Sequence, residues 1–499
     1  MPARREDLSR KVTAAVTATS ALHSAGVLID IVLTAVLSRL LTPADYGIVA
    51  AAMLFLALCS LLREVGVGAT VIQIADLSED DQRTGMTLVL ISSLLIFAVA
   101  QMTAGLFAGF LHMAAAEPAL RLLSLIILIQ AFSTIAESLL LRNLQVAKVM
   151  RLEVLAKLLA YCLVGILMAW LGHGYWALVA AMIVEAVLRA VALLAIVKPS
   201  FRLQLNKASM RKLLGTGSGF TASKIINFIA LRADVTVVGR FLDAASLGIY
   251  SRAYKLMSMP TDLYAKVADR VVFPAMAKVQ QEPARLRSAY LRGVTLTALL
   301  GIPLTVVLYV LSPHIIAVLL GSQWSGVVPV FSVLAIGTYF RLGARVSGSL
   351  LRATGSVGHL IWAQSFYAVL TIGGTIYAAQ YGLVAIGAAV GIAILLWFVV
   401  LTAQACRVAG VSTRAFLFAH WHALLLGAVT GLLTAGTDHL VARHTDHGFV
   451  VMLAVLGVLL LLLCCIIGLR PRFLLGTEGQ ALAEQIRGAV MSKIRRRTR

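Results

Sequence analysis

The sequence predicts an all-α membrane protein of about fourteen transmembrane helices. Of its 499 residues, 60% are hydrophobic and only 13% are charged, whereas roughly a quarter of the residues of a soluble protein are charged. Apolar runs of about 20 residues, long enough to cross a bilayer as a helix, recur along the whole chain. The basic residues gather in the short segments between these runs, which is typical of a polytopic membrane protein.

Twelve apolar segments and two charged ones make up the predicted spans. The apolar segments are 12–38, 46–62, 85–111, 119–141, 154–172, 175–197, 293–320, 325–350, 358–380, 383–405, 416–437 and 448–469. The segments 217–240 and 246–277 are long enough to span but carry several charges each. This order predicts a six-helix lobe in 1–200, a second lobe in 201–410, an additional helix pair in 411–470 and a basic cytoplasmic tail in 471–499.

Loop charge predicts the orientation. With a cytoplasmic N-terminus, the inside segments include 142–151, 198–212 and 278–287, which are rich in Lys and Arg. The outside loops 111–118 and 171–175 contain neither residue. This asymmetry favours an even number of spans with both termini cytoplasmic. The basic N-terminus leads into the first span and has no clear cleavage site, so it is interpreted as part of the mature chain.

An internal repeat relates the two predicted lobes. Residues 38–52 read SRLLTPADYGIVAAA and residues 239–253 read GRFLDAASLGIYSRA, with Arg, Leu, Ala, Gly and Ile at matching positions. Two further matches, 140–142 with 350–352 and 174–181 with 382–389, follow in the same order. Because each copy holds six spans, an even number, both cross the membrane in the same direction. Parallel six-helix lobes predict a central cleft between them.

Segment 246–277 places its charges on one helix face. Arg252, Lys255, Asp262, Lys266 and Asp269 fall within a stripe of about 100° at helical spacing. Each charge facing lipid at the bilayer centre costs roughly 2.5–3.5 kcal/mol, so the stripe predicts a hydrated cavity. The alternative is a helix that projects past the membrane, and for Lys266 and Asp269 the two interpretations are equally supported.

Three titratable residues are candidates for ion coupling. Asp30 lies deep in the first span, and His23 shares its helix face. An intramembrane carboxylate is a functional hypothesis by default. The alternative of equal weight is a structural hydrogen bond or an ion pair with a basic residue of the other half. Asp234, in segment 217–240, lies on the face that also carries Lys224, so these two charges are placed to balance one another.

Several function classes are disfavoured. The net charge of +21 is spread over loops, which argues against nucleic-acid binding. The five cysteines lie in apolar stretches without metal-binding spacing, and no phosphate loop or nucleophile elbow occurs. We therefore expect neither an enzyme nor a bound cofactor or metal. Glu185 and Arg189 are spaced i,i+4, which favours a structural ion pair, while Arg341 and Arg345 are intramembrane charges without an assigned role.

Three stretches resemble a known family. Residues 37–73, LSRLLTPADYGIVAAAMLFLALCSLLREVGVGATVIQ, closely resemble the bacterial lipopolysaccharide/polysaccharide biosynthesis flippases (oligosaccharide flippases) of the multidrug/oligosaccharidyl-lipid/polysaccharide exporter superfamily. Residues 239–260 and 271–280 resemble the matching stretches of that family's second half. The resemblance implies two six-helix lobes around a cleft plus two extra helices. It also implies alternating access that moves an undecaprenyl-diphosphate-linked oligosaccharide across the bacterial inner membrane, coupled to a proton or sodium gradient.

A diphosphate-linked sugar suits basic residues in a water-filled cleft, because arginine binds phosphate in a fork geometry. Arg63, Lys224, Arg252 and Lys255 are therefore the predicted substrate-binding residues, and Asp30, His23 and Asp234 the predicted coupling residues. The expected partners are the lipid-linked oligosaccharide and the bilayer, with a polysaccharide polymerase or glycosyltransferase assembly as a further expectation for an otherwise monomeric protein. The alternatives are a multidrug/cation antiporter, which would need an acidic cleft, and a membrane polysaccharide polymerase, which would need larger outside loops.

Overall fold

The structure is a computed structural model that describes residues 22–63, 67–74, 76–198, 202–214, 221–443 and 448–469, together with 479, 480 and 484. These described residues form helices and short turns with no strand, which confirms the all-α class. Within these described ranges, twelve helices are long and apolar enough to cross a membrane. The helices α11 (Thr221–Phe241) and α12 (Ala244–Val267) have the length but carry charges, so the predicted total of fourteen depends on these two.

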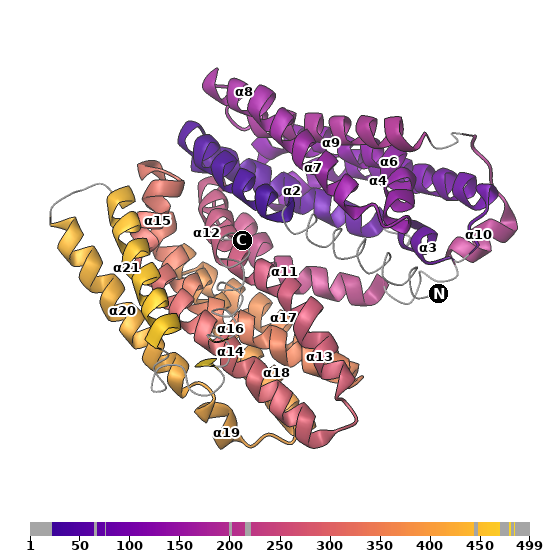
Figure 1. Ribbon diagram of the computed structural model, residues 1–499. Coiled ribbons are helices and arrows are strands. Elements are labelled where there is room, and N and C mark those ends of the chain that lie inside the picture. The colour runs from indigo at the N-terminus through magenta and orange to yellow at the C-terminus, as the bar shows by residue number, and fades with distance from the viewer. Residues whose placement is uncertain are drawn as a thin grey trace, which may run out of the picture. The chain divides into compact units, whose positions relative to one another are not determined.

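The chain divides into two compact units. In Figure 1, most of unit 1 is coloured indigo to magenta and most of unit 2 pink to yellow. Unit 1 comprises Met1–Phe228 and Val238–Gly248, and unit 2 comprises Ile229–Val237 and Ile249–Arg499. The turn that joins α11 to α12 therefore belongs to unit 1, whereas most of α12 belongs to unit 2. The division into two lobes, a helix pair and a tail stays a prediction.

Unit 1 is built from the first helix and α2 to α10. Their bounds are Leu22–Leu40, α2 Pro43–Arg63, α3 Val67–Gln73, α4 Glu79–Phe110, α5 Glu117–Leu123, α6 Leu125–Arg142, α7 Val146–Ala160, α8 Ile166–Trp170, α9 Trp176–Val197 and α10 Lys207–Leu214. Helix α6 packs against α4 and α9, and α9 also packs against α7. Two predicted spans are interrupted: α5 and α6 meet at Ser124, and a π-helical turn, Tyr161–Gly165, separates α7 from α8.

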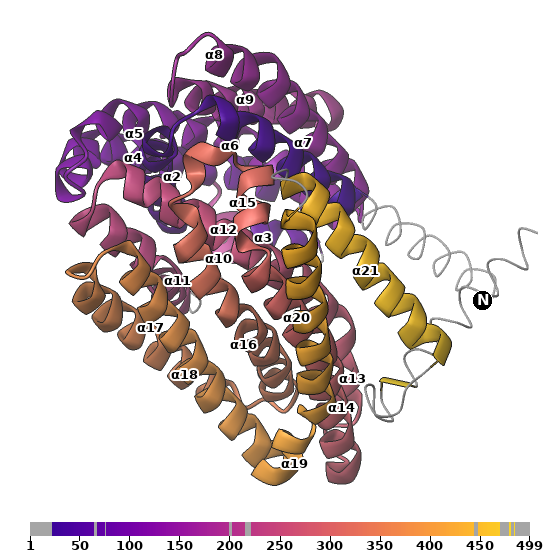
Figure 2. The same ribbon diagram turned by 90° about the vertical axis from the view of Figure 1, so that its left-hand side faces the viewer.

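Unit 2 is organised around α16. Besides α11 and α12, its helices are α13 Phe273–Lys278, α14 Pro283–Val310, α15 Ser312–Leu319, α16 Val327–Ala353, α17 Val357–Ala379, α18 Leu383–Ala409, α19 Thr413–Phe418, α20 Trp421–Ala442 and α21 Gly448–Leu469. Helix α16 packs against α14 and α18, α17 packs against α18, and α20 packs against α14 and α21; α17 and α18 lie side by side in both ribbon views (Figure 2). The core of this unit includes Tyr290, Val346 and Leu350, which are fully buried.

The repeated motif makes a reciprocal contact within unit 1. A Cβ added at Gly47 of α2 would overlap the carbonyl oxygen of Ala244, and one added at Gly248 of α12 would overlap the carbonyl oxygen of Pro43. Only glycine allows backbones to approach this closely. Pro43 corresponds to Ala244 in the repeat, and Gly47 corresponds to Gly248. We call this arrangement the glycine contact.

Short acidic caps shape the two turns that precede these helices. In the first turn of α2, Asp45 accepts a hydrogen bond from the Thr42 amide at 2.9 Å and another from the Tyr175 amide at 2.8 Å. Before α12, Asp243 accepts one from the Ser246 amide at 2.8 Å. Hydrogen bonds from the Ser246 hydroxyl and amide hold the pKa of Asp243 below its ordinary value. Both turns are therefore fixed by side-chain capping.

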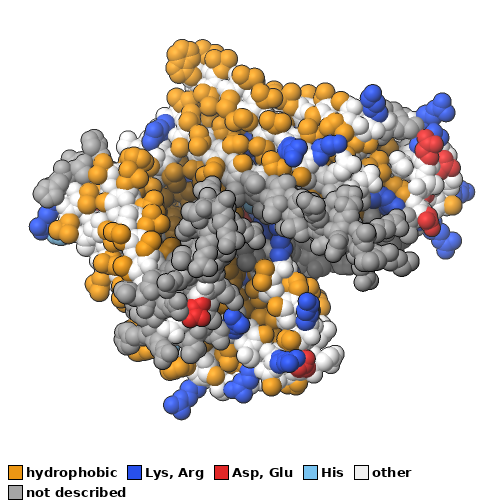
Figure 3. Space-filling model, viewed as in Figure 1, with side chains coloured by type: hydrophobic (Ala, Val, Ile, Leu, Met, Phe, Trp, Pro, Cys, Tyr) orange, Lys and Arg blue, Asp and Glu red, His pale blue; other side chains and the backbone are white. Residues whose placement is uncertain are grey.

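The outer surface is strongly apolar. Figure 3 shows hydrophobic side chains over α8 and over α20 and α21, whereas charged side chains gather at the end of unit 1 where α3 and α10 lie. Leu106 and Met102 of α4 are exposed, as are Leu432 of α20 and Leu461 of α21. Exposed apolar helices with charges confined to their ends are typical of a multi-pass membrane protein.

Candidate functional site

Unit 1 holds a cluster of charges between its helices, formed by residues that we call the acidic cluster: Asp30, Glu137, Glu153, Lys157, Glu185 and Arg189. Lys157 of α7 pairs with Asp30 of the first helix, with Nζ 3.1 Å from Oδ1. Arg189 of α9 pairs with Glu137 of α6 at 2.7 Å. Glu185 interacts electrostatically with Lys157, Glu153, Arg189 and Asp30. The cluster therefore combines four carboxylates with two cations.

Asp30, a predicted coupling residue, forms an ion pair with Lys157 of the same unit and not with a basic residue of the other half. Its side chain and that of Lys157 are both partly exposed, so the pair is not sealed from its surroundings. His23 lies two turns before Asp30 on the same helix and is half-buried. The sequence spacing favoured an ion pair between Glu185 and Arg189, but Arg189 forms its ion pair with Glu137 and only a longer-range electrostatic interaction with Glu185. Packing of α9 against α6 brings the Glu137 carboxylate closer.

Unit 2 holds a different arrangement, which we call the tyrosine–arginine cluster: Asp234, Tyr250, Tyr254, Arg341 and Tyr367. Asp234 is almost fully buried and accepts hydrogen bonds from the Tyr250 hydroxyl at 2.7 Å and from the Val235 amide at 2.8 Å. These contacts compensate for the burial of a polar carboxyl group. Asp234 is thus enclosed by protein in this structure, in contrast to Asp30.

Arg341 of α16 joins three helices of unit 2. Its Nη2 donates to the hydroxyls of Tyr254 on α12, at 2.9 Å, and Tyr367 on α17, at 3.3 Å. The guanidinium lies 5.0 Å from the centre of the Tyr254 ring, a distance at which a cation and an aromatic face attract each other. Its Nε is buried and has no hydrogen-bond partner among the described residues.

Helix α16 carries further arginines on the same face. Arg345 and Arg352 follow Arg341 by about one and three turns, so helical spacing aligns all three within about 40°. Arg352 pairs with Asp269 at 2.5 Å and lies over the Phe273 ring at 5.5 Å. Arg345 is exposed and interacts electrostatically with Asp262 and Asp269. This arginine stripe was left without a role by the sequence, although its spacing is visible there.

The predicted substrate-binding residues are placed as follows. Arg252 is half-buried on α12 and Lys255 is exposed one turn later. Tyr254, which lies between them in the sequence, accepts a hydrogen bond from Arg341 and so links α12 to the arginine stripe of α16 within unit 2. Arg63 ends α2 and Lys224 lies in α11, but their side chains lie outside the described part of the structure. Their predicted roles remain predictions.

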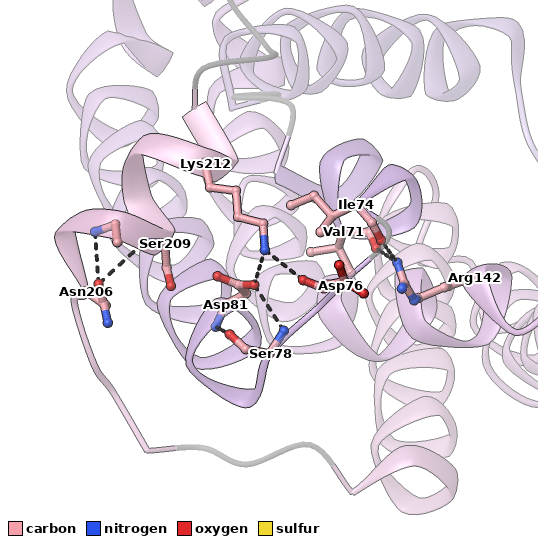
Figure 4. A network of polar contacts seen from close by, with 10 residues as sticks. Val71, Ile74, Asp76, Ser78, Asp81, Arg142, Asn206, Ser209 and Lys212 are labelled. Carbon is pink, nitrogen blue, oxygen red and sulfur yellow. Dashed lines mark hydrogen bonds and ion pairs between the residues drawn. The ribbon is translucent and has the colours of Figure 1, made fainter.

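A third polar network fixes the segment after α9 (Figure 4). Lys212 of α10 reaches Asp81 and the carbonyl oxygen of Asp76, each at 2.7 Å. Asp81 is buried and forms a capping box with Ser78 at the start of α4. Nearby, Arg142 donates to the Val71 carbonyl at 3.0 Å and to that of Ile74. The predicted inside loop 198–212 thus contains a helix that is anchored to α3 and α4.

No group of three His, Cys, Asp or Glu side chains in the described part of the chain is arranged to hold a metal ion. The arrangement instead offers carboxylates paired with cations in unit 1, and arginine with tyrosine hydroxyls in unit 2. The first can exchange protons or cations, and the second can bind phosphate and hydroxyl groups.

Comparisons with known proteins agree with this arrangement. A family described as polysaccharide biosynthesis protein matches residues 36–329. The succinoglycan biosynthesis transport protein ExoT of Rhizobium meliloti (strain 1021) is 28% identical over 353 residues, which cover 70% of each chain.

Two solved structures share the fold. The lipid II flippase MurJ, in an inward closed conformation, superposes with a TM-score of 0.73 at 15% identity, covering 91% of this chain and 98% of that chain. An inward-facing multidrug resistance MATE transporter of the MOP superfamily reaches a TM-score of 0.59 at 14% identity, covering 80% and 95% respectively. Because the family match covers more than half of the sequence, the chain belongs to the polysaccharide biosynthesis protein family.

Proposed function

We propose that this protein translocates an undecaprenyl-diphosphate-linked oligosaccharide across the bacterial inner membrane, for the synthesis of a surface or secreted polysaccharide. The family assignment and the similarity to ExoT support transport in polysaccharide biosynthesis, and the fold shared with MurJ is compatible with moving a lipid-linked sugar. We propose a transporter rather than an enzyme, with both termini cytoplasmic. Operation as a monomer and assembly with a polymerase or glycosyltransferase are parts of the same proposal.

One observation carries the substrate assignment. Helices α12 and α16 together contain six cations and a single carboxylate, Asp262. The hydrogen bond between Arg341 and Tyr254 links these two helices. Four of the cations, Arg252, Lys255, Arg341 and Arg345, lie away from the helix ends, where a charge facing lipid would be costly. A diphosphate offers the negative charge that such a surface needs, and a membrane-bound lipid tail can remain in the bilayer.

The acidic cluster supports a proposal for energy coupling. A proton on Asp30 would remove the charge that holds Lys157 at 3.1 Å. The remaining carboxylate interactions of Lys157 would then be those with Glu185 and Glu153, which it already makes electrostatically. In this proposal, His23 on the same helix delivers the proton to Asp30 or receives it. Asp234 is enclosed by Tyr250 and Val235, so we assign it second rank among the coupling candidates.

A second candidate function is multidrug or cation antiport, which the fold shared with a MATE transporter allows. The specific observation in its favour is the excess of carboxylates in the acidic cluster, since a cationic drug needs an acidic site. The cation excess on α12 and α16 favours the anionic glycan instead. These two functions differ in which unit holds the cargo.

The test is complementation of a strain that lacks this gene and has no redundant flippase. Wild type, Arg252→Ala, Lys255→Ala and Arg341→Ala are compared at matched membrane levels, with the exposed Arg414→Ala on α19 as a control. We expect the deletion to lose surface polymer and to accumulate lipid-linked repeat units. The α12 and α16 variants should restore polymer poorly and Arg414→Ala fully. Normal polymer in the deletion strain would refute the flippase function, and full rescue by all three test variants would refute the basic substrate site.

A further inference from the structure

A groove in unit 2 carries chemistry that the transport proposal does not use. It lies between α17 and α18, has a volume of about 550 Å³, and lies where α17 begins and α18 ends. Its polar lining comes from both helices: His359 on α17, and Gln404 and Arg407 on α18. The helices are antiparallel neighbours (Figure 2). The volume suits a small-molecule group rather than a macromolecule.

The lining of the groove is basic and has one unsatisfied polar atom. The lining residues include His359 and Arg407 but no carboxylate. Gln404 Oε1 is buried and has no hydrogen-bond partner among the described residues. A buried acceptor without a partner costs free energy, so this amide favours a ligand that brings a hydrogen-bond donor. The ligand chemistry that fits is a phosphate group combined with a hydroxyl or amine.

Space for such a group exists beside the backbone at the start of α17. A Cβ added at Gly358 would meet nothing within 4 Å, and the preceding Ser356 forms no side-chain cap. The first amides of a helix lack intrahelical acceptors and favour negative charge. Among the first amides of α17, those of Val357 and His359 already donate to the carbonyl oxygens of Gly355 and Ser356. The positive charge of the groove wall therefore comes chiefly from Arg407.

The surroundings of the groove are those of a membrane interface. Trp362 is largely exposed one turn inside α17 and stacks on Phe366 with ring centres 5.6 Å apart. Tryptophan at the end of a spanning helix is typical of the headgroup level. Farther along the same two helices, Ile361, Leu396, Val399 and Val369 are exposed and apolar. A lipid with its head in the groove would place its chains along this face.

We propose that the groove between α17 and α18 binds the phosphodiester headgroup of a bilayer phospholipid. Arg407 and His359 bind the phosphate, and Gln404 accepts a hydrogen bond from the hydroxyl or amine of the headgroup. Phosphatidylglycerol combines a negative charge with such hydroxyls. Phosphatidylcholine has a phosphate but no donor, and sn-glycerol 3-phosphate supplies the same phosphate chemistry from solution.

The experiment measures lipid binding to the purified, delipidated full-length protein in detergent by native mass spectrometry. Phosphatidylglycerol is titrated against wild type, Arg407→Gln, Gln404→Leu and the control Arg414→Gln, which removes an exposed arginine outside the groove. We expect Arg407→Gln to weaken binding about tenfold or more, because a charge-assisted hydrogen bond is lost. Gln404→Leu should abolish the preference for phosphatidylglycerol over phosphatidylcholine, and Arg414→Gln should bind like wild type.

Two results would overturn the proposal. If Arg407→Gln and Gln404→Leu bind phosphatidylglycerol as the control does, while eluting as monodisperse protein, the groove is not a headgroup site. If sn-glycerol 3-phosphate displaces the lipid at equal concentration, the groove takes a soluble phosphate compound instead. Since no transport is measured, the outcome is independent of the proposed translocation.

Discussion

Replacement of the two repeat glycines by alanine tests whether the glycine contact stabilises the protein. In an unobstructed helix, Gly→Ala stabilises by about 0.5–1 kcal/mol. At Gly47 and Gly248, however, the new methyl group would overlap a backbone carbonyl oxygen. Overpacking costs about 1–3 kcal/mol, and a backbone atom cannot rotate away as a side chain can. We therefore expect each single substitution to destabilise the protein by about 1 kcal/mol or more.

The double variant gives the sharper result. Once Gly47→Ala has pushed the two turns apart, Gly248→Ala should add little, because both methyl groups need the same separation. The measurement is the free energy of unfolding in mixed micelles for both singles and the double. Gly109→Ala on α4 is the control, since a Cβ there meets nothing within 4 Å. Stabilisation of both single variants to the extent seen at Gly109, or full additivity in the double, would contradict the reciprocal contact.

Three further predictions concern single side chains. Lys157→Met removes the ion pair with Asp30 and should lower the transport rate at matched membrane levels, while Arg414→Gln should not. An unchanged rate would separate this pair from coupling. Lys212→Met removes the ion pair with Asp81 and should destabilise the protein by about 1 kcal/mol, because the lysine is partly exposed to solvent. Limited proteolysis between α9 and α11 would detect this as faster cleavage, and equal cleavage would show that α10 is held by other contacts. The pKa of Asp243 is lowered in the folded state, so its capping stabilises the protein above about pH 4 and this stabilisation is lost at lower pH. The Tm difference between wild type and Asp243→Ala should therefore shrink on acidification. A Tm difference that does not change with pH would contradict this assignment.

The sequence predicted what depends on hydropathy and helical spacing. The spans, the two charged helices and the internal repeat all follow from patterns along one chain. The breaks at Ser124 and at Tyr161–Gly165 were missed, because a break within an apolar run leaves hydropathy unchanged. Helix α10 was missed for a different reason: its stability depends on Lys212 finding Asp81 on α4, more than 100 residues earlier.

Side-chain partners were the least predictable part of the site. Asp30 and Lys157 lie on helices far apart in the chain, so neither helix alone indicates the pair. Arg189 had a partner at i−4 by spacing, yet pairs with Glu137 of α6 through tertiary packing. Arg341, Arg345 and Arg352 were predictable as one stripe from their spacing. The sequence could not predict that the Tyr254 and Tyr367 hydroxyls orient Arg341, because these tyrosines lie on other helices.

The glycine contact also bears on the ancestry of the chain. The glycine of each repeat copy lies against a carbonyl group of the other copy: Gly47 against Ala244, and Gly248 against Pro43. Such a surface is self-complementary. Self-complementary surfaces are those of twofold homodimers. The contact is therefore the one expected if a self-pairing protein was duplicated and its two copies were fused. In the present chain, Thr-Pro-Ala-Asp and Asp-Ala-Ala-Ser differ in sequence, whereas both glycines of the contact are kept.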